Sequence, residues 1–397
     1  MEHKYDIFTL DQILNNGKKL QINSSTETIN ELMNKLKAEA EKDNPTFLNL
    51  KESCFDLICR LPLPINIYNG FVLRARPNEP ELFSHQSQIS YNSERPEQIK
   101  LQRFNLDEEQ VFYCAPPIDG HNENGAITTI AESFKEIFDK KGIWQHKALT
   151  IGKWIVQKPI NLLVLPFYGK GLNKSFHLQN IAKPFEWFLN EFCSEEDRNK
   201  LRMFYSFFSE RTGKVIDTPN NYLLTTAFYH SVREFYGEEV GILYSSSSTE
   251  NRGINIVLSK KIIDSGYLKL DTIAVYEVYR HTFFRNQLFS LPTMLAFIDE
   301  GEKFELKKMT LEEIHSVTLE RDVEQAKNSG LKLNVLIAGD KCCSECDKIN
   351  GMKFQFKEIL QKPILPYHKC SRPNFCKCFY LFEPVRNENN ELIEAKY

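Results

Sequence analysis

The feature that most constrains this chain is the crowding of its cysteines near one end. Six of its ten cysteines lie in the last fifth of the 397 residues, within the stretches DKCCSECDK and HKCSRPNFCKC. The N-terminus, MEHKYDIFTLDQ, lacks the basic start and apolar run of a secretory signal. A disulfide framework would be unusual in such a chain, whereas CxxC spacing is typical of metal sites. The sequence therefore predicts a small metal-binding module.

The cysteine spacing fits a closed, tetrahedral structural zinc site. Cys343 and Cys346 form a CxxC pair, and further donors follow about 25 residues later. A thiolate-rich site usually has no open position, so this predicts structural rather than catalytic zinc. The predicted ligands are Cys343, Cys346, Cys370 and Cys376, with Cys378 and His368 as alternates and Cys342 as a spectator. Reduced, unligated thiols in a small β-rich module are the alternative.

The overall composition is that of a soluble globular protein. Hydrophobic residues make up 42% of the chain and charged residues 26%, and the 12% aromatic content argues against disorder. A net charge of −3 gives no general attraction to nucleic acid or anionic membranes. No stretch approaches the roughly 18 apolar residues that span a bilayer. We therefore expect a cytoplasmic protein with no membrane partner.

The apolar patterns predict an α+β protein with four parts. Residues 1–65 are expected to be helical, with Ser25 or Thr26 capping the helix in TETINELMNKLKAEAEKD. Residues 66–305 mix strands with a helical insert at about 175–237. A polar connecting helix is expected over 306–332, before the cysteine-rich module at 333–397.

Several polar and aromatic residues recur in one order through the central region. An arginine lies in an apolar strand, an Arg and an Asn follow a polar loop, and an acidic residue opens a helix. A serine and an asparagine then follow the helical insert. The motifs are Arg74 in LRAR, Arg103 and Asn105 in LQRFN, Tyr113 in FYCA, Ala131-Glu132, Tyr244 and Ser246 in GILYSS, and Asn255 in INIVLS.

This ordered set resembles the RES domain family, the NAD-degrading and ADP-ribosylating toxin domains. The resemblance covers about residues 65–265, and it implies an ADP-ribosyltransferase-like mixed β core with NAD as the substrate. The chain departs from the family pattern at Gln102, at Leu106-Asp107 and at Ser245, which affects the expected geometry of the substrate loops. No charged or hydroxyl group of the pattern is missing.

The chemistry of NAD cleavage explains the residue types that the resemblance implies. Breaking the nicotinamide–ribose bond develops positive charge on the sugar, which the carboxylate of Glu132 would stabilise. Arg74 would grip the pyrophosphate or the ribose, since a guanidinium offers a rigid fork of donors to phosphate oxygens. Arg76, two residues along the same strand, would point the same way, and Arg103 would hold a second phosphate.

The remaining residues of the pattern are expected to contact the nicotinamide ribose. Tyr113 would stack on nicotinamide or hydrogen-bond the sugar, and Ser246 would hydrogen-bond the ribose or the carboxamide. Because residues 245–248 are all serine, the serine could be displaced by one position. The predicted catalytic residues are Glu132, Arg74, Ser246 and Tyr113, and the predicted NAD-binding residues are Arg74, Arg76, Arg103, Asn105, Tyr113, Tyr244, Ser246 and Asn255.

Three functions remain open from the sequence. NAD⁺ hydrolysis or phosphorolysis, in a toxin or defence effector, is favoured over protein mono-ADP-ribosylation. The third is a zinc-containing protein with a non-catalytic central domain that binds a partner or nucleic acid, since residues 340–378 carry eight basic against four acidic side chains. Small RES toxins are neutralised by an antitoxin, so an antitoxin or another regulatory protein is a further expected partner. The tail also resembles the C-terminal segment of phage Mu F-like head-morphogenesis proteins, which implies a small folded module.

Overall fold

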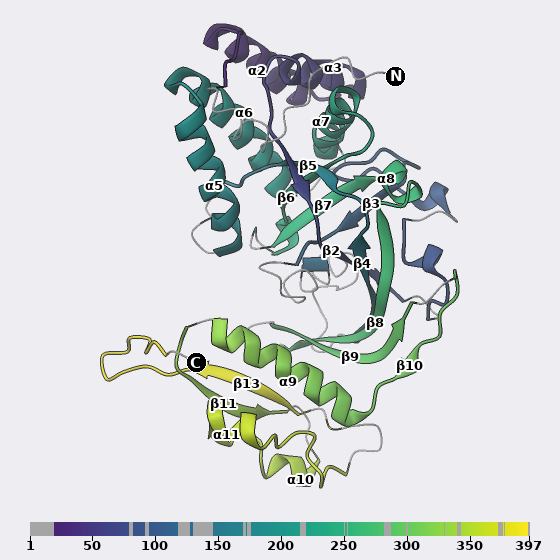
Figure 1. Cartoon of the computed structure of the whole chain (residues 1–397), viewed down its shortest axis with the longest axis vertical. Coiled ribbons are helices and arrows are strands. Elements are labelled where there is room, and N and C mark those ends of the chain that lie inside the picture. Colours follow the sequence, from purple (N-terminus) through teal and green to yellow (C-terminus); the bar gives the residue numbers. More distant parts are fainter. Residues whose placement is uncertain are drawn as a thin grey trace. The chain divides into compact units, whose positions relative to one another are not determined.

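The fold is that of a mixed α+β protein, as the sequence predicts, and Figure 1 shows its computed structural model. Two compact units are present: Met1–Ile273 with Ala296–Glu305, and Ala274–Leu295 with Leu306–Tyr397. No helix among the described residues is long and apolar enough to cross a membrane. The structure describes residues 20–78, 82–91, 95–117, 128–129, 146–169, 172, 176–214, 220–249, 251, 253–281, 287–298, 301–328, 330–339, 343–371, 376 and 378–395.

A five-stranded sheet in the order β1-β5-β6-β7-β3 forms the centre of the first unit. All its neighbouring strands are antiparallel except β5 and β6, whose parallel pairing requires the long helical crossover between them. Its strands are β1 (Ile65–Tyr68), β3 (Val111–Cys114), β5 (Ile160–Val164), β6 (Val240–Ser245) and β7 (Ile254–Ser259).

Five helices pack with one face of this sheet into a single hydrophobic core (Figure 1). The helices before β1 belong to this core, because they pack on those of the β5–β6 crossover. Ser25 caps the first of them: its Oγ accepts a hydrogen bond from the amide of Thr28 at 3.2 Å. The helices are α2 (Thr26–Ala40), α3 (Phe47–Ile58), α5 (Phe176–Phe192), α6 (Glu195–Gly213) and α7 (Asn220–Tyr236).

Three longer strands pair beside this sheet. β2 (Phe71–Pro77) pairs antiparallel with β4 (His146–Val156), and Arg74 lies opposite Gly152. β8 (Leu268–His281) follows β4 in the strand order. Two 3₁₀ turns, Gln86–Gln88 and Pro96–Gln98, interrupt the polar loop after β2. That loop supplies the carbonyl groups that hold Arg74 and Arg76.

The second unit contains a three-stranded sheet in the order β12-β11-β13, covered by helix α9 (Leu311–Asn328) (Figure 1). Its strands are β11 (Leu333–Ala338), β12 (Lys353–Gln355) and β13 (Phe379–Pro384), and its short helices are α10 (Ser344–Asp347) and α11 (Phe356–Gln361). Apolar side chains of α9 and β11 share one core with Cys346, Cys376 and Cys378. The unit also includes the second half of β8, most of β9 (Gln287–Phe297) and β10 (Lys307–Lys308).

Replacing Phe228 with alanine should strongly destabilise the first unit. Phe208 and Phe228 are fully buried and their rings stack with centroids 3.9 Å apart, linking α6 to α7. Such a truncation leaves a cavity and costs about 3–5 kcal/mol. Urea denaturation followed by tryptophan fluorescence measures this loss. Leu48→Ala, at a side chain that is 67% exposed, should change the free energy of unfolding far less; equal losses in the two variants would contradict the packing described.

Candidate functional site

Arg74 is the half-buried centre of the first group of predicted site residues. Its Nη1 donates to the carbonyl oxygen of Tyr113 at 2.7 Å, and its Nε donates to the carbonyl of Ser90 at 3.2 Å. The guanidinium carbon lies 4.8 Å from the centroid of the Phe112 ring. No carboxylate pairs with Arg74 among the described residues. Arg74 is therefore a desolvated cation held only by neutral groups.

The electrostatics of Arg74 follow from this environment. Burial, with a smaller effect from neighbouring Arg76, lowers the pKa of the Arg74 guanidinium to about 9. The side chain still carries its charge at neutral pH, and an anion brought to it would offset the desolvation. Arg76 donates to the carbonyl of Gln88 at 2.8 Å, so both arginines point toward the 82–91 loop, as their spacing on one strand predicts.

Tyr113 connects this arginine to the LQRFN loop. The Tyr113 hydroxyl donates to Oδ1 of Asn105 at 3.0 Å and accepts from the amide of Phe104 at 2.9 Å. The Asn105 side chain, 1% exposed, in turn donates to the carbonyls of Lys100 and Leu106. Burial raises the pKa of Tyr113, which keeps its hydroxyl protonated as a donor. Tyr113 and Asn105 thus form a buried framework rather than an open surface.

Arg103 connects the same loop to the turn that follows β6. Its guanidinium is 8% exposed and donates to the carbonyls of Arg211, Thr212 and Lys214 at the end of α6. It also donates to Oγ of Ser247 at 2.9 Å. These donors are directed at the chain itself. Arg103 therefore fixes the end of α6 against the serine turn.

The four-serine stretch forms a buried turn between β6 and β7. Ser246 is fully buried, and its amide donates to the carbonyl of Gly253 at 2.9 Å. The Ser245 hydroxyl donates to Oδ1 of Asn251 at 3.0 Å, while Ser247 bonds to Arg103. Ser247 is therefore the serine of this stretch that contacts Arg103.

Tyr244 and Asn255 lie directly opposite each other on β6 and β7. They are 4% and 5% exposed, and the Tyr244 ring packs edge-on against Phe104 with centroids 4.8 Å apart. Both side chains therefore lie beneath the LQRFN loop. The pattern residues outside Glu132 accordingly come together in one region of the first unit.

Glu132 lies outside the described residues. The chain just before it is described at Thr128 and Thr129, both buried. A Cβ placed on Gly253 would lie 2.2 Å from Oγ1 of Thr128, so Thr128 packs directly on the turn that contains Ser246.

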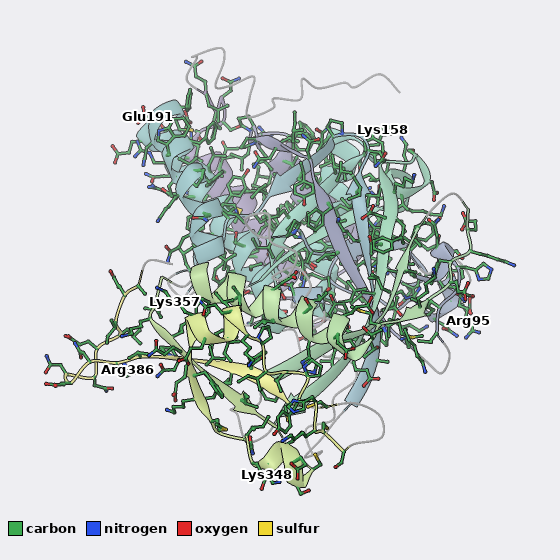
Figure 2. All side chains as sticks on the ribbon, turned by 60° about the horizontal axis from the view of Figure 1, so that its bottom comes forward. Arg95, Lys158, Glu191, Lys348, Lys357 and Arg386 are labelled. Carbon is green, nitrogen blue, oxygen red and sulfur yellow. The ribbon has the colours of Figure 1, made fainter. Side chains whose placement is uncertain are left out.

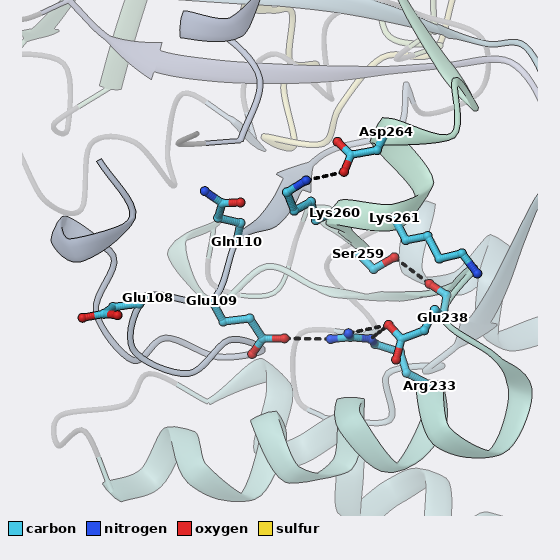
Figure 3. A pocket seen from close by; sticks show the side chains of 9 residues that line it. All are labelled: Glu108, Glu109, Gln110, Arg233, Glu238, Ser259, Lys260, Lys261 and Asp264. Atoms are coloured by element: carbon cyan, nitrogen blue, oxygen red, sulfur yellow. Dashed lines mark hydrogen bonds and ion pairs between the residues drawn. The ribbon is translucent and has the colours of Figure 1, made fainter. Parts of the chain in front are cut away.

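A separate pocket of about 410 Å³ lies at the C-terminal end of β7, whereas the serine turn precedes the N-terminal end of that strand (Figure 3). In it, Arg233 contacts Glu109 at 2.7 Å and also pairs with Glu238, while Lys260 pairs with Asp264. Burial favours the protonated Glu109 carboxyl, but its contacts with His230, Arg233 and the Leu106 amide together lower its pKa. Because these charged side chains pair with one another, their charges do not indicate which kind of ligand the pocket would bind.

The thiol cluster of the second unit is built by two loops beside β11. The sulfur of Cys343 caps α10 and accepts from the amide of Cys346 at 3.4 Å. Tyr380 holds the second loop, because its hydroxyl accepts from the amides of Ile364 and Leu365, both at 2.7 Å. No disulfide joins cysteines within the described part of the chain.

Five described cysteines come together in this cluster, which could hold a metal such as zinc. Cys343 and Cys370 have sulfurs 3.9 Å apart, and Cys346 and Cys376 have sulfurs 3.8 Å apart. A tetrahedral ion with Zn–S bonds of about 2.3 Å holds its sulfurs about 3.8 Å apart. The predicted alternate His368 is exposed and belongs to no such group, and Cys342 lies outside the described residues.

The thiols of the cluster differ in acidity. Hydrogen bonds with the backbone of Ser371 and Cys346 lower the pKa of Cys343 to about 6, and the Cys378 side chain lowers that of Cys376 to about 4. Burial raises the pKa of Cys346. The lowered pKa values of Cys343 and Cys376 favour the thiolate, which is the form of cysteine that binds metal ions.

One further residue at the cluster was missed in the sequence. His315 on α9 is 4% exposed, and its ring hydrogen-bonds to the backbone of Cys376. Burial lowers the pKa of His315, so the ring is neutral at pH 7. The available signal was its spacing: His315, Leu319 and Val323 share one helix face, and the latter two lie in the core.

The described part of the second unit carries several exposed basic side chains. Lys348, Lys357 and Arg386 stand apart from one another on the surface of the second unit (Figure 2). Lys348 pairs with Glu345 at 2.5 Å, and Lys353 pairs with Glu383 at 2.9 Å. Part of the positive charge is thus neutralised locally.

No protein-family model matches this chain, and no curated protein matches it. The site is accordingly interpreted from its own residues.

Replacing Tyr113 with phenylalanine should destabilise the first unit by about 1–3 kcal/mol. The change leaves the Asn105 oxygen and the Phe104 amide without their shared partner, which carries the penalty of unsatisfied buried groups. Chemical denaturation measures the loss. Tyr91→Phe is the matched control, since that hydroxyl bonds to Asp264 at the surface. A Tyr113→Phe protein as stable as the control would contradict the framework.

Proposed function

We propose that the first unit is a RES-type enzyme with an ADP-ribosyltransferase-like core, which cleaves the nicotinamide–ribose bond of NAD⁺ as a glycohydrolase or phosphorylase. The observation that carries the proposal is the half-buried Arg74, which pairs with no carboxylate in the described part of the chain. A buried cation without an anion is costly unless a ligand supplies one. The pyrophosphate of NAD⁺ is such an anion.

The hydrogen bonds of Arg74 leave one end of its guanidinium for this ligand. Nε and Nη1 donate to carbonyl oxygens, whereas Nη2 makes no hydrogen bond with the described residues. The two carbonyl contacts fix the plane of the group in advance. We assign Nη2 to a phosphate oxygen, because charge-assisted contacts of this kind are the strongest hydrogen bonds available to an arginine.

Glu132 supplies the second charge that the reaction needs. As nicotinamide leaves, positive charge develops on the ribose, and a carboxylate beside the anomeric carbon lowers the barrier. Thr128, a described residue four positions before it in the sequence, packs on Gly253 beside the serine turn. Glu132 would also orient the water or phosphate that attacks the sugar.

In this proposal most of the other pattern residues position the loops and side chains of the site. Tyr113 holds Arg74 through its carbonyl and Asn105 through its hydroxyl, and Arg103 holds Ser247 in the turn. Tyr244 and Asn255 support the loop from below. Ser246 and Arg76 are the remaining candidates for direct contact with the ribose and the phosphates.

Incubating the purified full chain with NAD⁺ and measuring nicotinamide release tests the proposal. Wild type should release nicotinamide, and Glu132→Gln should lower kcat by about 10²–10³-fold, as the loss of one transition-state contact does. Adding phosphate and identifying the sugar product separates phosphorolysis from hydrolysis. Glu136→Gln, four residues along the same stretch, is the control and should retain wild-type turnover.

Arg74→Lys should lower kcat/KM for NAD⁺ by about 10–100-fold, since an ammonium cannot keep both carbonyl contacts and still reach a phosphate. Arg60→Lys, at an exposed arginine, should leave kcat/KM unchanged. Without nicotinamide release from wild type the enzyme proposal fails, which leaves a binding protein. Transfer of the label from NAD⁺ to protein would instead indicate mono-ADP-ribosylation.

We also propose that the thiol cluster holds structural zinc through Cys343, Cys346, Cys370 and Cys376. Two sulfur separations support this set, 3.9 Å for Cys343 with Cys370 and 3.8 Å for Cys346 with Cys376, since each matches an edge of a zinc–thiolate tetrahedron. Cys346 lies within 4.8 Å of both Cys343 and Cys370, and Cys376 would have to move toward that pair when the ion binds. Four thiolates leave no position for water, so the ion would stabilise the fold of the second unit rather than act in catalysis.

Metal analysis of the purified chain under reducing conditions tests the zinc site. At least one zinc per chain is expected, and removing it with a strong chelator should open the second unit to proteolysis while nicotinamide release persists. Cys193→Ser, at a buried cysteine of the first unit, is the control and should retain the zinc. A metal-free native protein would rule out the site.

A further inference from the structure

Two side-chain N–H donors on the β2–β4 strand pair have no hydrogen-bond partner among the described residues. One is Nη2 of Arg74, whose other nitrogens donate to carbonyl oxygens. The other is the indole Nε1 of Trp154, which is buried. Trp154 is 4% exposed, so bulk water does not supply the missing acceptor. Buried donors in folded proteins are nearly always satisfied, and an exception therefore points to a ligand.

The strand register places the two side chains on the same face of the sheet. Arg74 lies opposite Gly152, and Val72 lies opposite Trp154. Directly opposite residues of an antiparallel pair project to the same side, and so do residues two apart on one strand. The indole and the guanidinium therefore come from adjacent residue pairs and share one side of the sheet.

The absence of a side chain at Gly152 brings the indole toward Arg74. A Cβ placed on Gly152 would lie 2.9 Å from Nε1 of Trp154. The same point is 3.0 Å from Cδ1 of Leu270 and 3.3 Å from Cγ2 of Ile89. The indole N–H therefore lies in the space directly opposite Arg74, between aliphatic side chains that offer it no acceptor.

The ring of Phe112 contacts both groups. The guanidinium carbon of Arg74 lies 4.8 Å from the centroid of this ring, and the Trp154 ring packs edge-on against it with centroids 5.2 Å apart. Phe112 is fully buried on β3. One fixed ring thus holds the cation and the indole as near neighbours.

We propose that Trp154 is a phosphate-binding residue, whose Nε1 donates to an oxygen of the phosphate group that Arg74 binds through Nη2. The inference deepens the proposed function, on which the identity of the ligand as the pyrophosphate of NAD⁺ rests. An indole N–H only donates, so its partner must be an acceptor, and a phosphate has several acceptor oxygens. Arg74 supplies the charge and Trp154 a second, directional contact. Gly152 serves as the positioning residue of the indole.

Calorimetric titration of the full chain with inorganic pyrophosphate, at constant ionic strength, tests the inference. Wild type should bind pyrophosphate. Trp154→Phe keeps an aromatic ring but has no N–H, and it should bind about 10–100-fold more weakly, as expected for the loss of a hydrogen bond to a charged group. Trp187→Phe, at a tryptophan of α5 that is 52% exposed, is the control and should bind as wild type does.

Gly152→Ala is a second variant that retains the indole. Its new methyl group would take the space in which Nε1 lies, so it should also weaken pyrophosphate binding. Equal binding by wild type and Trp154→Phe would overturn the inference and leave the indole N–H as a contact of the Phe112 ring. The absence of pyrophosphate binding by wild type would overturn it as well.

NAD⁺ kinetics distinguish this inference from the enzyme proposal. Trp154→Phe should raise KM for NAD⁺ by about 10–100-fold and leave kcat nearly unchanged, because a phosphate contact acts equally in the ground state and the transition state. A fall in kcat with an unchanged KM would contradict a binding role. Pyrophosphate binding that depends on Trp154, in a protein that releases no nicotinamide, would support the anion site while the enzyme proposal fails.

Discussion

Two guanidinium groups that hydrogen-bond to carbonyl oxygens hold the first unit together around its candidate site. Arg74 joins β2 to β3 and to the loop after β2, and Arg103 joins the LQRFN loop to α6 and the serine turn. Neither pairs with a carboxylate among the described residues. Carbonyl groups fix the direction of a guanidinium but do not neutralise it, so Arg74, whose Nη2 makes no hydrogen bond with the described residues, keeps a positive charge for an anionic ligand, whereas Arg103 serves to position the chain.

The helices before β1 and those of the β5–β6 crossover give this arrangement its rigidity. They share one core rich in aromatic side chains with the face of the sheet that carries Tyr113 and Tyr244. The LQRFN loop lies between this core and the serine turn, where Thr225 of α7 also hydrogen-bonds to the Arg103 carbonyl. Small displacements of the loop are therefore opposed on several sides. Such rigidity is what a site needs in order to orient a ligand before reaction.

The core of the second unit has a different composition. It is small, and its core consists partly of thiols. Sulfur packs well as an apolar atom, but the lowered pKa of the buried Cys376 favours a thiolate, which an apolar core does not tolerate without a cation. Metal binding would reconcile these two properties, and it would make folding of this unit depend on metal supply.

The sequence by itself determined the local structure and the kinds of chemistry available. Apolar periodicity and the Ser25 cap predicted the helix Thr26–Ala40, because both signals depend on neighbours along the chain. Spacing also predicted that Cys343, Cys346, Cys370 and Cys376 would gather, and that Arg74 and Arg76 would point the same way. These properties follow from the fixed geometry of short segments.

Only the tertiary structure decided how distant segments share their hydrogen bonds. Nothing in LQRFN indicates that the Arg103 guanidinium donates hydrogen bonds to carbonyl oxygens more than 100 residues later in the chain. Nor does the sequence place His315 of a polar helix beside Cys376, or show that Cys346 belongs to two thiol groups. Such contacts depend on how whole elements pack. An arginine, tyrosine or cysteine of a motif can therefore either position the chain or contact a ligand. Its burial and its hydrogen-bond partners in the folded protein decide between these two roles.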